Sequence, residues 1–76
     1  PGARFNLPPR DDPAFDAAAA DAILSSALAG DTGSGEAATG YYWGEPKLFP
    51  YVRKILERAQ AEGDERLEQL ARRFLR

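Results

Sequence analysis

The stretch Asp12-Pro-Ala-Phe-Asp-Ala-Ala-Ala-Ala-Asp-Ala-Ile-Leu-Ser-Ser-Ala-Leu-Ala-Gly30 decides the fold class of this chain. Alanine, the strongest helix former, dominates it. Asp12 is typical of an N-cap, Pro13 of a first helical position and Gly30 of a C-terminal stop. The sequence therefore predicts a helix over 13–29. Its apolar residues recur at helical spacing and form one face: Phe15, Ala19, Ala20, Ile23, Leu24, Ala27 and Leu28.

Two further helices are predicted in the C-terminal part of the chain, over 48–62 and 65–75. The first has an apolar stripe made of Leu48, Val52, Ile55, Leu56 and Ala59. The second has a shorter stripe made of Leu67, Leu70, Ala71 and Phe74. Gly63 ends the first helix and Asp64 caps the second, so a short turn makes them an antiparallel hairpin. Glu68 and Arg72 form a favourable i,i+4 pair.

The remaining segments complete the prediction of an all-α, single domain over 1–76. Residues 1–11 contain three prolines and form an extended arm that carries Phe5 and Leu7. Residues 30–40 have no apolar side chain larger than alanine and are rich in glycine, serine and threonine. This composition predicts a flexible linker. An aromatic loop and the helix hairpin occupy 41–76.

The composition argues against catalysis and against metal or cofactor binding. The chain has no cysteine and no histidine, which excludes Cys/His zinc sites and histidine acid–base chemistry. Asp31-Thr32-Gly33-Ser34 matches the short signature of aspartic proteases, but it lacks the strand and the second copy that this chemistry needs. We therefore expect no enzyme, no cofactor and no metal. We expect a cytoplasmic protein without a signal peptide or a membrane-spanning segment.

Charge is distributed unevenly along the chain. Residues 1–46 carry two basic and seven acidic residues, a net charge of −5, whereas 47–76 carry eight basic and five acidic residues, a net charge of +3. The favoured interpretation is that two halves of one domain attract each other. The alternative is that this polarity steers a partner.

Five of the eight aromatic residues lie within 41–51: Tyr41, Tyr42, Trp43, Phe49 and Tyr51. One interpretation places Trp43 and one tyrosine in the core; the other turns some rings outward as anchors for a partner. The first hypothesis for function is a non-catalytic protein–protein interaction module, such as an adaptor, an inhibitor or an accessory subunit. Its partner is another protein or a second copy of this chain, and Arg53 supplies a charged rim.

The alternative hypothesis is a small nucleic-acid-binding regulator. Positive charge and aromatic stacking faces are the minimum for contact with nucleic acid. The net charge of −2 weighs against this hypothesis. The basic residues that would contact nucleic acid are Lys54, Arg58, Arg72, Arg73 and Arg76.

Overall fold

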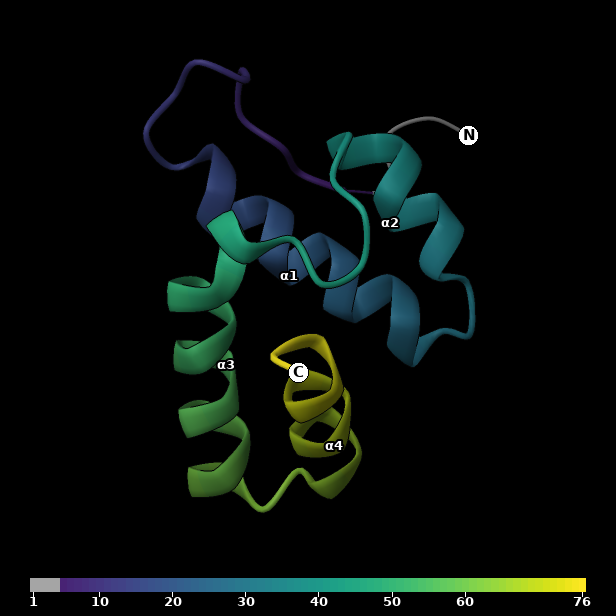
Figure 1. The fold of residues 1–76 in the computed structure, drawn as a ribbon, viewed down its shortest axis with the longest axis vertical. Helices are drawn as coiled ribbons and strands as arrows, with labels where there is room; N and C mark the ends of the chain where they lie inside the picture. Colours follow the sequence, from purple (N-terminus) through teal and green to yellow (C-terminus); the bar gives the residue numbers. More distant parts are fainter. Residues whose placement is uncertain (1–4) are drawn as a thin grey trace.

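The computed structural model describes residues 5–76, so residues 1–4 of the predicted arm lie outside the described residues. Between 5 and 76 the chain contains helices and no strand, which confirms the all-α class (Figure 1). The elements in chain order are α1 (Phe15–Leu28), α2 (Thr32–Thr39), the short 3-10 helix η1 (Pro46–Leu48), α3 (Phe49–Glu62) and α4 (Glu65–Phe74).

Helix α1 lies at the centre, with the α3–α4 hairpin against one side and α2 against another (Figure 1). It is buried around most of its circumference, because its predicted apolar face packs on the hairpin while Ala22 and Ser26 are covered as well. The α3–α4 hairpin contributes its predicted stripes to the same core. The buried hydrophobic residues of this core are Phe15, Ala19, Ala20, Ile23, Leu24, Leu48, Val52, Ile55, Ala59, Leu67, Ala71 and Phe74.

The start of α1 differs slightly from the prediction. Asp12 does not cap the helix directly: its carboxylate accepts a hydrogen bond from the Ala14 N–H at 2.8 Å, and its carbonyl accepts one from the Phe15 N–H at 2.9 Å. These bonds form a turn in front of the helix, which begins at Phe15 instead of residue 13. The C-terminal stop is as predicted, since Gly30 adopts a left-handed φ of 76° just after the helix.

The turn between α3 and α4 matches the prediction. Gly63 takes a left-handed φ of 71° at the end of α3, and the Asp64 carboxylate accepts a hydrogen bond from the Leu67 N–H at 3.2 Å. The Glu68–Arg72 ion pair is present at 2.9 Å on the exposed side of α4. The turn of this hairpin therefore follows the local capping signals of the sequence.

The prediction of a flexible linker over 30–40 is wrong, because helix α2 occupies Thr32–Thr39. Its N-cap is Asp31, whose carboxylate accepts hydrogen bonds from the Ser34 N–H at 3.3 Å and from the Ser34 hydroxyl at 2.5 Å. Gly35 is buried where α2 crosses α1. A Cβ at this position would contact the Ser26 hydroxyl and lie 3.0 Å from the Ile23 Cα. The small residues that suggest a linker thus allow two helices to pack closely.

The C-terminus of α2 is fixed by Arg10 from the arm. The Arg10 guanidinium donates a hydrogen bond to the Thr39 carbonyl at 2.8 Å and lies over the Phe15 ring, 5.1 Å from its centroid. Thr39 is fully buried; its hydroxyl donates to the Gly35 carbonyl at 2.8 Å. A cation at the last carbonyls of a helix also complements the helix dipole. The arm, α2 and the start of α1 are therefore joined at one point.

The described part of the arm runs beside α1 without regular structure (Figure 1). Leu7 is half-buried against the core. Within 5–76, no helix combines the length and the apolar character that crossing a membrane requires.

Gly35→Ala tests the close packing of α2 on α1. Because the added methyl group meets backbone atoms of α1, we expect the free energy of unfolding to fall by about 1–3 kcal/mol. Gly33→Ala is the matched control in the same helix: its Cβ would meet nothing closer than 4.0 Å, so greater helix propensity should stabilise the fold by up to about 1 kcal/mol. Urea denaturation followed by circular dichroism measures both, and equal effects would contradict this packing.

Candidate interaction surface

The aromatic segment at 41–43 is held at both ends and open in the middle. The Tyr41 hydroxyl donates a hydrogen bond to the Asp16 carboxylate on α1 at 2.7 Å. The Trp43 backbone N–H donates to the Glu36 carboxylate on α2 at 2.8 Å. Tyr42 lies between these two anchored residues and is 79% exposed. Three consecutive aromatic residues therefore have three different environments.

Three of the predicted partner-binding aromatics, Tyr41, Trp43 and Phe49, pack against the core. Trp43 packs edge-on against Phe74, with the ring centroids 5.0 Å apart, and Phe49 packs against the same ring at 6.1 Å. Both Trp43 and Phe49 are half-buried. Tyr41 is also half-buried, and its ring centroid lies 6.3 Å from that of Phe15. Most of the aromatic rings in this segment thus complete a small core.

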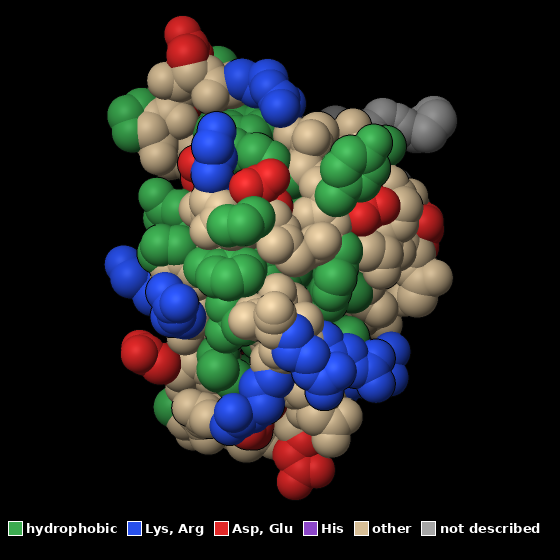
Figure 2. Space-filling model, viewed as in Figure 1, with side chains coloured by type: hydrophobic (Ala, Val, Ile, Leu, Met, Phe, Trp, Pro, Cys, Tyr) green, Lys and Arg blue, Asp and Glu red, His purple; other side chains and the backbone are tan. Residues whose placement is uncertain are grey.

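Tyr42 borders a shallow hollow of about 390 Å³ on α2, lined also by Gly33, Glu36, Ala37 and Gly40. In Figure 2, hydrophobic side chains reach the surface over the segment between α2 and η1. Small residues leave the backbone of α2 accessible beside the exposed ring. Among residues 5–76, Tyr42 is the large hydrophobic side chain that stands out as exposed.

Two other predicted site residues lie elsewhere. Tyr51 lines a separate hollow of about 180 Å³ between α1 and α3, together with Lys54 and Arg58. The Arg53 guanidinium lies over the Phe49 ring, 5.8 Å from its centroid, on the surface of α3. The predicted set of six partner-binding residues is therefore distributed over more than one part of the molecule.

The predicted basic residues do not form one surface either. Arg58 pairs with Asp21 of α1 at 3.9 Å, and Arg72 pairs with Glu68 within α4. Arg73 instead lines a hollow beside Trp43, and Arg76 is exposed just after α4. In Figure 2, Lys and Arg side chains gather over α4 and toward the end of α1, whereas others lie apart along α3.

Arg66 lines a hollow but was not among the residues predicted from the sequence. It lies on the same face of α4 as Leu70 and Arg73, and all three line one hollow of about 380 Å³ with Ala27, Thr32 and Trp43. The signal was present as i, i+4, i+7 spacing, which places residues on one side of a helix. Of the cations on α4, only those at its C-terminal end were predicted to contact a ligand, and the arginine of the first turn was not.

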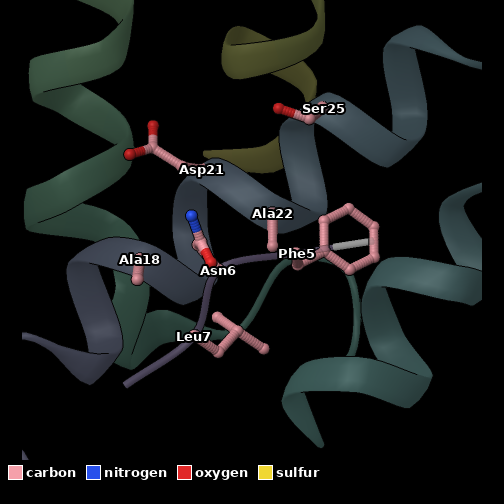
Figure 3. Close-up of a pocket in the computed structure, with 7 residues that line it drawn as sticks. All are labelled: Phe5, Asn6, Leu7, Ala18, Asp21, Ala22 and Ser25. Atoms are coloured by element: carbon pink, nitrogen blue, oxygen red, sulfur yellow. The ribbon is translucent and has the colours of Figure 1, made fainter. Parts of the chain in front are cut away.

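A further hollow, of about 360 Å³, lies between the arm and α1 (Figure 3). Phe5, Asn6 and Leu7 line it from the arm, and Asp21 and Ser25 are the polar side chains that α1 contributes. In Figure 3 the Asp21 carboxylate points toward α3, where Arg58 pairs with it. The hollow offers no assembled acid–base pair. In the described part of the chain, no group of three or more acidic, cysteine or histidine residues is placed to hold a metal ion.

Comparisons with protein-family models, with curated proteins and with solved structures give no significant match to this chain. Its function is therefore argued from its own surface.

The environment of Tyr41 has a measurable electrostatic consequence. The hydrogen bond to the Asp16 carboxylate raises the pKa of the Tyr41 hydroxyl above its ordinary value of 10.0. Partial burial and the negative charge of Asp16 raise this pKa further, while Arg10 lowers it. Because the pKa is raised in the folded state, the contribution to stability is complete below pH 10.0 and is lost as the pH rises through the folded pKa.

Asp16→Asn should lower the pKa of Tyr41 toward 10.0, because it removes the charged acceptor of the hydroxyl. A titration of the tyrosine ring carbons by NMR measures this pKa, with Tyr41→Phe assigning the signal. Asp21→Asn removes a carboxylate from the same helix that pairs with Arg58 and should leave the Tyr41 titration unchanged. A Tyr41 pKa at or below 10.0 in the unmodified protein would contradict the Asp16 contact.

Proposed function

We propose that this chain is a non-catalytic protein–protein interaction module that binds a partner protein through the Tyr42 surface, defined as Tyr42 and the adjoining side of α2. The observation that carries the proposal is the exposure of the Tyr42 ring, 79%, between two anchored neighbours. Tyrosine is enriched at the energetic centres of interfaces because it combines a large apolar area with a hydroxyl group. An exposed ring on a fixed backbone is suited to this role.

Anchoring of the flanking residues favours binding energetically. Tyr41 is bonded to α1, and Trp43 is bonded to α2 and packed on α4. The backbone that presents Tyr42 is therefore ordered before a partner arrives, and binding costs less conformational entropy than ordering a flexible loop would. The hollow beside the ring adds room for a partner side chain over Gly33, Ala37 and Gly40.

This proposal is narrower than the set of six residues expected from sequence. Tyr42 is the anchor and Trp43 contributes its exposed part, whereas Tyr41 and Phe49 support the loop from the core side. A partner that is a second copy of this chain would use the same surface twice.

Nucleic-acid binding is the second candidate, and the gathering of arginines over α4 favours it (Figure 2). Two features weigh against it: Arg58 and Arg72 are paired with carboxylates, and the cations of α3 lie apart from those of α4. Nucleic-acid affinity that depends on several phosphate contacts would fall steeply with salt concentration. Protein binding centred on a tyrosine would not.

Tyr42→Ala tests the proposed surface. We expect the immobilised unmodified domain to capture a stoichiometric protein from a lysate of its source cells, with or without nuclease, and Tyr42→Ala to lose it. Because Tyr42 is exposed, the free energy of unfolding of this variant should differ from that of the unmodified domain by less than about 0.5 kcal/mol. Lys47→Ala, at an exposed position of η1, is the control that should retain the partner.

Two outcomes would contradict the proposal. Retention of the partner by Tyr42→Ala would show that the ring is not the anchor. Loss of captured proteins on nuclease treatment would show that nucleic acid mediates the association, and would favour the second candidate.

A further inference from the structure

The hollow beside Trp43 combines an apolar base with two cationic sides. Ala27, Leu70 and the Trp43 indole provide apolar surface, and Arg66 and Arg73 extend from α4. This arginine–tryptophan hollow has a volume of about 380 Å³. It adjoins the Tyr42 surface, because Thr32 lines one hollow and Gly33 the other at the start of α2.

The two arginines of this hollow differ from Arg58 and Arg72 in their partners. Neither Arg66 nor Arg73 forms an ion pair with any residue of 5–76, whereas Arg58 and Arg72 do. Arg66 makes a single long hydrogen bond, to the Leu28 carbonyl at 3.4 Å. A guanidinium group has five donors in a planar arrangement suited to carboxylates and phosphates. The guanidinium groups of Arg66 and Arg73, on the two sides of the apolar surface, therefore keep hydrogen-bond donors free for a ligand.

We propose that the arginine–tryptophan hollow binds an acidic segment of the partner protein in which carboxylates flank an apolar side chain. This inference rests on the proposed function, because it supplies the chemistry of the partner that the Tyr42 surface would meet. The apolar side chain lies against Trp43 and Leu70, and the carboxylates accept hydrogen bonds from Arg66 and Arg73. Charge-assisted bonds of this kind are the strong ones at interfaces.

The spacing of the arginines agrees with an extended peptide. Arg66 and Arg73 are seven residues apart on α4, which places their Cα atoms about 10 Å apart along the helix axis at ~1.5 Å per residue. Acidic residues four positions apart in an extended chain span about 14 Å at ~3.4 Å per residue, and they share one face with the residue midway between them. One apolar residue between two carboxylates therefore fits between the two guanidinium groups.

A single short acidic segment is favoured over nucleic acid by the extent of the positive charge. The hollow holds two cations without an ion pair, Arg66 and Arg73. Lys54 and Arg58, which line the hollow between α1 and α3, face Asp21 of α1. A polyanionic backbone gains affinity by contacting many cations along its length. Two arginines around an apolar surface instead match a short peptide that has two carboxylates and an apolar side chain between them.

Trp43 is the single tryptophan of the chain, so its fluorescence reports on this hollow. The probe is the peptide acetyl-Glu-Gly-Phe-Gly-Glu-amide, which has no tyrosine or tryptophan, added to the full chain at low salt. We expect a saturable change in Trp43 emission with this peptide. The Gln-for-Glu peptide should bind about tenfold more weakly or worse, because charge-assisted hydrogen bonds are lost.

Variants separate the hollow from general charge. Arg66→Gln and Arg73→Gln should each weaken peptide binding about tenfold, since each removes the charge from one guanidinium partner. Arg72→Gln is the matched control on the same helix: its side chain pairs with Glu68, so peptide affinity should be unchanged. Circular dichroism should be the same for all three variants, because all three positions are exposed.

Three results would overturn this inference. These are no saturable change with the acidic peptide, equal binding of the Gln peptide, or tighter binding of an oligothymidylate than of the peptide at the same salt concentration. The proposed function is tested independently by partner capture through Tyr42. A partner captured through Tyr42 without peptide binding at Trp43 would remove the inference and leave the proposed function in place. Peptide binding with capture unaffected by Tyr42→Ala would remove Tyr42 from the proposed function and leave the hollow as a site for acidic peptides.

Discussion

The close approach of α2 to α1 at Gly35 is the constraint on which the rest of the structure depends. Gly35 lies against backbone atoms of α1 near Ala22 and Ile23, and no larger residue would fit without moving one of the helices. This contact fixes the position of α2, and Glu36 of α2 then fixes Trp43. The placement of the exposed Tyr42 ring therefore follows from a packing contact several residues earlier in the chain.

The arm reinforces this arrangement from the other end of α2. Arg10 bonds to the Thr39 carbonyl and covers the Phe15 ring, so the C-terminus of α2 and the start of α1 are held together. The opposite charges of the two halves of the chain contribute less than the sequence suggested. Within residues 5–76, the ion pair between the two halves joins Arg58 and Asp21; it is long at 3.9 Å and exposed, and such surface pairs contribute about 0–1 kcal/mol.

Local signals in the sequence were sufficient for three of the helices and not for the fourth. Helices α1, α3 and α4 have helical apolar periodicity and local caps, so their bounds could be predicted to within a few residues. Helix α2 is capped by Asp31 and Gly40 but has no apolar periodicity. Glycine lowers its intrinsic helix propensity, and the close contact with α1 is what makes glycine favourable there. The same limit applied to the candidate site, because its arrangement depends on contacts between separate elements. Aromatic density marked 41–51 as the candidate segment. Which of its residues is anchored and which is exposed depends on Asp16 and Glu36, which lie 25 and 7 residues away from their partners Tyr41 and Trp43.

The different environments of these three aromatics also bear on why Tyr42 is a tyrosine. Tyr41 and Trp43 have partners within the chain that account for their rings: Asp16 and Phe15 for the first, Phe74 for the second. The backbone of residue 42 follows from these neighbours, and an exposed position would be filled equally well by a small polar side chain. A large ring there gains little from the fold, because most of its surface stays in water. Its exposed area is therefore free for the contact with a second molecule that we propose.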